Sequence, residues 1–146
     1  MNKSEILKTV SEKLDLKINT LENLIAETRA SNNETKSSMG DKYETTREMV
    51  QQEINNLQLQ LNENVKAKNS LKFINTNPHH VIGSGSLVET ERGLFFIAVS
   101  LGEITLEKKK IFVISPESPL AKAMKELKKG EKFSVNSIQQ SVLHIE

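Results

Sequence analysis

The chain has 146 residues, and its 20 basic and 19 acidic side chains give a formal net charge of +1. This balance argues against binding to nucleic acid or to a membrane surface through bulk charge. The chain has no cysteine, which excludes disulfides, a thiol nucleophile and a cysteine metal site. No apolar run approaches the roughly 20 residues that span a bilayer, so we expect a soluble, cytoplasmic protein of one domain or two small units.

The first half of the chain has the pattern of a helix. From Ser4 to about Arg29 there is no glycine or proline, and Ser4 is a candidate N-cap. The apolar residues follow the alternating spacing of a heptad seam, with Lys17 in one slot and isoleucines that widen the stripe. The expected seam is Leu7, Val10, Leu14, Leu21 and Leu24, flanked by Ile6, Ile18 and Ile25.

A second helical segment is predicted from about Asp41 to Leu71. Its seam slots are Val50, Ile54, Leu57, Leu61, Asn64, Lys68 and Leu71, so the pattern becomes more polar toward its end. Single amphipathic helices of this length are marginal in water, but two of them can bury their stripes against each other. We therefore predict an antiparallel helical hairpin over residues 1–72, with its tip at about residues 30–42 in "SNNETKSSMG". Each arm would be roughly 45 Å long.

A linker and a small sheet follow the predicted hairpin. "FINTNPHH" at residues 73–80 contains the breaker pair Asn77-Pro78 and is the expected linker. Beyond it the apolar period changes to two. "SLVET" and "LFFIAVS" flank Glu91-Arg92-Gly93, which predicts a β-hairpin with Gly93 at positive φ. "KKIFVIS" reads as a strand, and "KFSVN" and "SVLHIE" are the expected closing strands.

One short helix is expected among these strands, in "SPLAKAMKELKKG". Ser118 is a candidate N-cap, Pro119 suits the first helical position, and Gly130 lies just past the last turn. The apolar face of this helix is formed by Leu120, Ala123, Met124 and Leu127. Residues 81–146 are therefore predicted to form a small antiparallel sheet domain with one short helix. The expected fold class is α+β.

Several of these stretches resemble the Gre transcript-cleavage factors of bacterial RNA polymerase. "ISPESPLAKAMKELKKGEKFSV" (residues 114–135) is similar to the C-terminal signature of that family, and "GSLVETERGLFFIAV" is similar to its earlier hairpin. "IAETR" and Tyr43 followed by Arg47-Glu48 resemble the two flanks of the coiled-coil tip. The resemblance implies an FKBP-like C-terminal domain that docks at the secondary channel of the polymerase. It also implies a coiled coil inserted toward the active site.

The resemblance implies specific partner-binding residues. The candidates are Tyr43, Arg47, Ser115, Ser118, Pro119 and Leu120. The expected partner is RNA polymerase, with nucleic acid contacted only indirectly through the elongation complex, and the expected state is a monomer. The protein would not be an enzyme, and at most it would stimulate RNA cleavage by the polymerase itself.

The tip departs from the family pattern, in which an Asp and a Glu help to hold a second Mg²⁺ in the polymerase site. Two such metal ions can activate water for phosphodiester cleavage. Counting forward from the "IAETR" flank places Asn33 and Lys36 in the two acidic slots. Counting back from Tyr43 places Lys36 and Met39 there. The family's acidic pair is therefore missing in both registers.

Other acidic residues at the tip remain candidates for cleavage chemistry. They are Glu34, Asp41 and Glu44, and Mg²⁺ would be bound only in the complex, through Asp41 or Glu44. A simpler interpretation is that Asp41 caps the second helix with Glu44 as its capping-box partner. The adjacent His79 and His80 cannot easily face one metal ion.

Two other functions remain open at this point. A non-catalytic coiled-coil adaptor would pair its arms between chains and form dimers. An FKBP-type isomerase or chaperone would need a deep pocket lined by aromatic residues, and the whole chain has five Phe and one Tyr.

Overall fold

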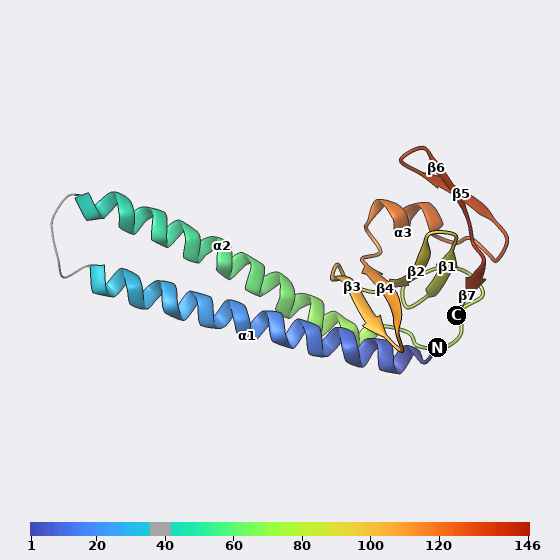
Figure 1. The fold of residues 1–146 in the computed structure, drawn as a ribbon, viewed down its shortest axis with the longest axis horizontal. Coiled ribbons are helices and arrows are strands. Elements are labelled where there is room, and N and C mark those ends of the chain that lie inside the picture. Colours follow the sequence, from blue (N-terminus) through green and yellow to red (C-terminus); the bar gives the residue numbers. More distant parts are fainter. Residues whose placement is uncertain (36–41) are drawn as a thin grey trace. The chain divides into compact units, whose positions relative to one another are not determined.

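The computed structural model describes residues 1–35 and 42–146, and within them the side chains of residues 1–31 and 46–146. The chain divides into two compact units, one made of Met1–Glu12 with Asn69–Glu146 and the other of Lys13–Lys68. Helices α1 (Lys3–Thr35) and α2 (Lys42–Ser70) precede the strands in the chain (Figure 1). Helix α1 contributes residues to both units. The expected α+β class, a helical hairpin followed by a sheet, is confirmed.

Helix α1 begins earlier than predicted. Asn2, and not Ser4, is the N-cap, because the Asn2 side-chain oxygen accepts a hydrogen bond of 2.8 Å from the backbone N–H of Ser4. The backbone carbonyl of Asn2 also accepts from the N–H of Ile6, at 3.2 Å. At its other end α1 continues to Thr35 through polar residues that contain no glycine or proline. Within the described ranges, no helix combines the length and apolar character needed to cross a membrane.

The seam of α1 differs from the predicted one by a single residue in three places, the first being Ile6, which is 0% exposed whereas Leu7 is half-buried. Ile25 is 5% exposed whereas Leu24 is 41% exposed, so Ile25 takes the slot that was assigned to Leu24. Ile18 is half-buried and replaces Lys17, which is exposed. The shift has a simple cause, because it places an isoleucine in a slot where the predicted register would bury a lysine ammonium.

The seam of α2 follows the predicted slots throughout. Each described slot is buried or half-buried, and in the hairpin unit these slots are Val50, Ile54, Leu57, Leu61, Asn64 and Lys68. The Lys68 ammonium forms an ion pair with the Asp15 carboxylate of α1. The two arms therefore pair within one chain, and the ion pair aligns them where the seam is most polar.

Seven strands form two sheets in the other unit. The strands are β1 (Leu87–Thr90), β2 (Gly93–Ile97), β3 (Gly102–Leu106), β4 (Lys109–Ile114), β5 (Lys132–Val135), β6 (Ile138–Ser141) and β7 (His144–Ile145), and a short 3₁₀ helix η1 (Leu71–Phe73) precedes them. The five-stranded sheet has the order β3-β4-β2-β1-β7, and β5 pairs with β6 separately. The predicted β1–β2 hairpin is confirmed, with Gly93 at φ +132°. One pair, β2 with β4, is parallel, so the sheet is mixed and not purely antiparallel.

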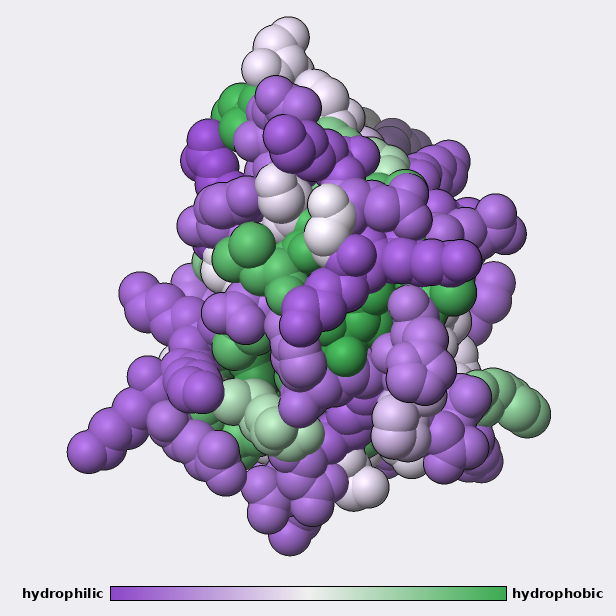
Figure 2. Space-filling view, turned by 90° about the vertical axis from the view of Figure 1, so that its right-hand side faces the viewer, coloured by the Kyte–Doolittle hydropathy of each residue, from purple (hydrophilic) through white to green (hydrophobic). Residues whose placement is uncertain are grey.

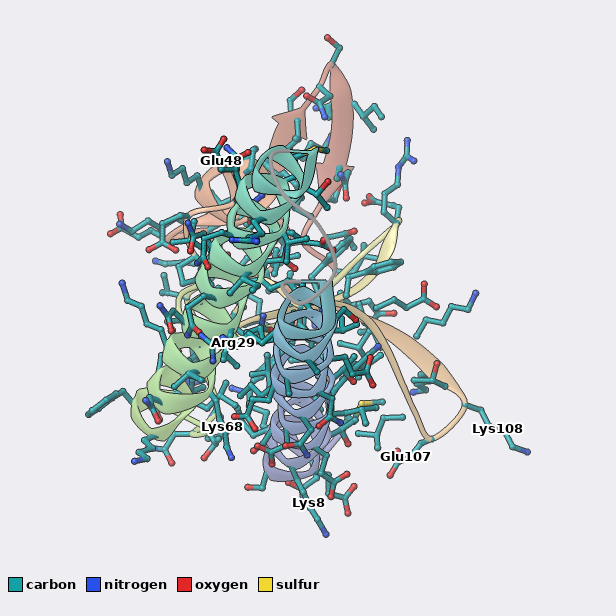
Figure 3. All side chains as sticks on the ribbon, turned by 90° about the vertical axis from the view of Figure 1, so that its left-hand side faces the viewer. Lys8, Arg29, Glu48, Lys68, Glu107 and Lys108 are labelled. Carbon is teal, nitrogen blue, oxygen red and sulfur yellow. The ribbon has the colours of Figure 1, made fainter. Side chains whose placement is uncertain are left out.

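Strands β3 and β6 were not predicted. Each belongs to a hairpin whose two-residue turn has both residues at positive φ, Glu107-Lys108 in one and Asn136-Ser137 in the other. Hairpin turns of this kind usually contain glycine, and neither of these does, so the usual sequence signal is weak. Glu107 and Lys108 point outward from their turn (Figure 3).

Buried polar contacts tie β6 to the β1–β2 hairpin. The Thr90 hydroxyl donates to the Gln140 side-chain oxygen at 2.8 Å, and both residues are buried. The Glu91 carboxylate accepts a 2.7 Å hydrogen bond from the backbone N–H of Ser141. This bond lowers the pKa of Glu91 below its ordinary value. The β1–β2 hairpin is about 50 residues away from β6 in sequence, and these two bonds position the smaller sheet beside it.

The large sheet buries apolar side chains on both faces. One face packs against helix α3 (Pro119–Met124) in a core cluster of Ile82, Val88, Phe95, Ile97, Ala121, Met124, Phe133 and Val142. The opposite face buries Leu87, Phe96, Ile104, Ile111 and Val113. Ile6 and Val10 of α1 belong to the same compact unit and are each 0% exposed. Apolar surface also remains in the middle of one face of the molecule, surrounded by hydrophilic side chains (Figure 2).

The segment from Asn75 to Ser86 folds closely onto itself. The His79 ring nitrogen Nδ1 lies 2.6 Å from the Ser86 hydroxyl, which accepts a 2.9 Å hydrogen bond from the N–H of Gly83. The hydroxyl proton can therefore be donated to His79 only while Nδ1 is unprotonated. Burial, and then the charge of Lys3, lower the pKa of His79 below its ordinary value.

The first prediction tests the register of the hairpin seam. Ile25→Ala should destabilise the hairpin by about 2 to 4 kcal/mol, because it leaves a cavity in the seam. Its neighbour Leu24→Ala is the matched control and should cost less than about 1 kcal/mol. Amide hydrogen exchange of α1 measures both. Equal losses, or a larger loss for Leu24→Ala, would contradict the seam described above.

The second prediction concerns Gly85, which has φ +92° and whose added Cβ would lie 2.2 Å from the backbone oxygen of Asn75. Gly85→Ala should destabilise the sheet unit by about 2 to 4 kcal/mol, since both the backbone and the contact would be strained. Gly83→Ala is the control, because no atom lies within 4 Å of its added Cβ. Hydrogen exchange of β1 and β2 amides should report the difference, and indistinguishable variants would refute it.

The third prediction concerns pH. The pKa of His79 is lower in the folded protein than in the unfolded chain. Between these two pKa values the unfolded chain binds more protons, so the free energy of unfolding rises with pH. The contribution of His79 should be complete above its unfolded pKa and should be lost as the pH falls through the folded value. Lys3, His80, His144 and Glu146 are the other titratable side chains that line the same surface hollow as His79.

Urea unfolding between about pH 8 and about pH 5 tests the sign of this dependence. His79→Gln should flatten the dependence of the unfolding free energy on pH. The oxygen of the glutamine side chain can still accept a hydrogen bond from the Ser86 hydroxyl, but glutamine does not titrate. The exposed neighbour His80 provides the control variant His80→Gln. An unchanged pH slope in His79→Gln would show that other groups produce the dependence.

Candidate docking site and hairpin tip

The N-terminus of α3 is organised by Ser118. Its hydroxyl donates to the carbonyl of Ser115 at 2.8 Å and accepts from the N–H of Ala121 at 3.2 Å. Its backbone N–H also donates to the Ser115 carbonyl, at 3.1 Å. Pro119 is the first helical residue, where it loses no hydrogen bond. The predicted N-cap is confirmed, and it holds the turn that precedes the helix in one conformation.

Helix α3 is shorter than the predicted segment. It ends at Met124, and Glu126 has φ +65°. The chain then pairs with the segment that precedes β1. The N–H of Glu126 donates to the carbonyl of Ile82, and the N–H of Ile82 donates to the carbonyl of Leu127, both at 2.9 Å. These tertiary bonds replace the last helical turn, so Gly130, at φ +91°, lies in a later turn and does not cap the helix.

A pocket of about 250 Å³ lies beside the capped end of α3. Its lining is Ile82, Gly83, Ser84, Ile97, Pro116, Glu117, Ala121, Lys122 and Lys125. Ile82, Ile97 and Ala121 are at most 3% exposed and form an apolar floor. Glu117, Lys122 and Lys125 are exposed charged residues of the lining. The pocket could accept one apolar side chain of a partner, whose flanking charges would meet this rim.

The structure brings the sequence-predicted docking residues together at this end of α3, but in different environments. Ser115 and Ser118 are half-buried and engaged in the cap. Leu120 is half-buried and packs against the core cluster. Pro119 alone of the four is exposed. Pro119 is therefore the residue of this set that is most available to a partner.

The contribution of Ile82, Gly83 and Ser84 to the pocket was not predicted from the sequence. These residues lie more than 30 positions before α3 in the chain and reach it only through the pairing with Glu126 and Leu127. No local pattern marks them. The apolar character of Ile82 was the one available signal, and it indicates burial without indicating a partner.

The tip candidates Glu34, Asp41, Tyr43 and Glu44 lie outside the residues whose side chains are described. Arg47 is described and half-buried, and its Nε atom is buried without a hydrogen-bond partner among the described residues. A buried guanidinium nitrogen without a partner is costly, so the Arg47 Nε–H can still donate a hydrogen bond to an acceptor on a partner.

The three histidines line one hollow of about 370 Å³, together with Lys3 and Glu146. His79 is held by Ser86, and His144 Nε2 lies 3.7 Å from the Glu146 carboxylate. The Lys3 ammonium is buried and donates to the carbonyl of Asn77 at 2.9 Å. Among the described residues, no group of three His, Asp or Glu side chains is placed to hold a metal ion.

Comparison with known proteins finds similarity in solved structures. No family model matches the chain, and no curated protein sequence matches it. The crystal structure of GreA factor homolog 1 (Gfh1) of Thermus thermophilus is 20% identical, covers 95% of this chain and 96% of its own, and has a TM-score of 0.40. A second structure of the transcription factor Gfh1 is 18% identical, covers 94% of each chain, and has a TM-score of 0.37. Both alignments extend over nearly the whole length of this chain.

Proposed function

We propose that this protein is a cytoplasmic Gre-type factor that binds bacterial RNA polymerase. In this proposal residues 81–146 dock at the secondary channel of the polymerase. Residues 73–80 form the linker to the coiled coil of residues 1–72, which is inserted toward the active site. The factor modulates elongation by occupying the channel, or stimulates cleavage of backtracked transcript by the polymerase itself. It performs no catalysis alone and acts as a monomer.

The observation that carries this proposal is the pairing of α1 with α2 inside one chain. The buried seam residues and the Asp15–Lys68 ion pair belong to the same molecule. A closed hairpin of this length buries little beyond its own seam, so it is better suited to reach than to core formation. A dimerising adaptor would have to pair these same apolar seams with a second chain, but in this structure they are buried within one chain.

The capped end of α3 supports the docking half of the proposal. The residues from Ile114 to Val135 that resemble the Gre C-terminal signature form this cap and most of the pocket beside it. An FKBP-type isomerase is less well supported, because none of the residues that line the pocket is aromatic. A pocket of about 250 Å³ is also small for a ligand site.

The tip sequence favours modulation over cleavage. Lys36 occupies an acidic slot of the family pattern in either register, and a lysine would repel Mg²⁺. If cleavage is stimulated, Asp41 or Glu44 is the residue that would share Mg²⁺ with the polymerase, since hard oxygen ligands suit that ion.

The fourth prediction tests docking on purified polymerase core enzyme. Pro119→Glu should weaken binding at least about tenfold, because it places a charge on the exposed docking residue. The helix should survive, because an acidic side chain at a helix N-terminus is favourable. Lys108→Glu, at the outward-pointing β3–β4 turn, is the control and should bind as the unmodified protein does.

Backtracked elongation complexes with Mg²⁺ then separate the two modes. We expect the protein to compete with a cognate cleavage factor without stimulating cleavage itself. If it stimulates cleavage, and Glu34→Ala, Asp41→Ala or Glu44→Ala abolishes that effect, the tip acid has a metal role. If the unmodified protein does not bind the core enzyme, the proposed function is wrong.

A further inference from the structure

A groove of about 460 Å³ runs between the two arms of the hairpin. It is lined by Lys13, Leu16, Lys17, Thr20 and Leu21 of α1 and by Gln60 and Asn64 of α2. All of these residues belong to the hairpin unit. Its lining shares no residue with the docking candidates at α3 or with the tip candidates.

The groove exists because two polar side chains bond to their own helices and not to each other. The Asn64 amide donates to the carbonyl of Gln60 at 2.7 Å, and the Thr20 hydroxyl donates to the carbonyl of Leu16 at 2.9 Å. Asn64 occupies a seam slot, where an apolar side chain would have filled the space between the arms. The polar groups are satisfied, and the space beside them stays open.

The floor and edge of the groove are apolar. Leu21 is 9% exposed and belongs to the seam, whereas Leu16 is 66% exposed at the edge. Two paired helices leave a groove on each side of their seam, and a further helix is the element that covers such a groove, at an axis separation of about 8–10 Å. An apolar side chain that covers Leu16 and Leu21 would be removed from water.

The charges of the lining have one sign. Lys13 and Lys17 are one helical turn apart, and no carboxylate lines the groove. Like charges at this spacing destabilise a helix slightly. Lys17 has no ion-pair partner in the part of the chain that the structure describes. A partner with carboxylates four residues apart on a helix would present them about 6 Å apart along its axis, matching the two lysines.

We propose that this groove binds an acidic amphipathic helix of a partner protein. The helix presents a row of apolar side chains to Leu16 and Leu21, and a flanking row of Asp or Glu spaced four residues apart to Lys13 and Lys17. The inference goes beyond the polymerase docking proposed above and does not depend on it. It can be tested without polymerase.

The probe is a synthetic helical peptide of about 21 residues with leucines on one face and glutamates four apart beside them. A matched peptide carries lysine at every glutamate position. Fluorescence anisotropy with the full chain should show binding of the acidic peptide alone. Lys17→Glu should weaken that binding about tenfold, and Leu16→Ala about fivefold.

Charge reversal provides a result that loss of structure cannot produce. The double variant Lys13→Glu, Lys17→Glu should bind the lysine peptide and lose the acidic one. Leu59→Ala and Lys66→Glu are exposed controls on α2 outside the groove lining, and they should leave the affinity unchanged.

Three results would overturn the proposal. The first is absence of binding at about millimolar peptide, which corresponds to less than about 4 kcal/mol. The second is binding that Lys17→Glu does not change. The third is self-association of the unmodified chain in sedimentation that Leu16→Ala abolishes, because the groove would then hold a second copy of this chain.

Discussion

The pairing of α1 with α2 is the interaction on which the rest of this protein depends. An amphipathic helix is marginal alone in water, so each of the two persists because the other covers its seam. Helix α1 also begins in the sheet unit, where Asn2 caps it and where Ile6 and Val10 are fully buried. One unbroken helix therefore takes part in both compact units. A substitution in its N-terminal turns would affect the sheet, whereas one near Ile25 would affect only the hairpin.

The seam is not uniformly apolar, and its polar slots have a consequence for surface chemistry. Asn64 and Lys68 weaken the hydrophobic contact near the base of the hairpin, and the ion pair of Lys68 with Asp15 offsets part of that loss. Because Asn64 bonds to its own helix, it leaves a groove that an apolar residue would have closed. A polar residue at position 64 thus lowers the stability of the helix pair. It also leaves the groove for which we propose a third helix as the occupant.

The candidate docking site depends on a different kind of interaction, backbone pairing between distant segments. The bonds of Ile82 with Glu126 and Leu127 end α3 early and bring Gly83 and Ser84 to its side. The cap at Ser118 holds the opposite end. Between them lies a pocket with an apolar floor and a charged rim, and the exposed Pro119 lies at the same end of α3. Backbone pairing thus holds one end of the site, and the Ser118 hydroxyl holds the other.

The sequence by itself determined the fold class, the two helical arms, the β1–β2 hairpin and the Ser118 cap. These features follow from local patterns: the heptad spacing, a period of two, and the turn and cap residues Gly93, Ser118 and Pro119. Only the tertiary structure decided that Ile25 and not Leu24 faces α2, that α3 stops at Met124, and that β3 and β6 form. It also decided the parallel pairing of β2 with β4, the pocket at Ile82 and the groove at Asn64. In each case the outcome depends on which remote backbone or side chain fills the neighbouring space, and no local pattern carries that information.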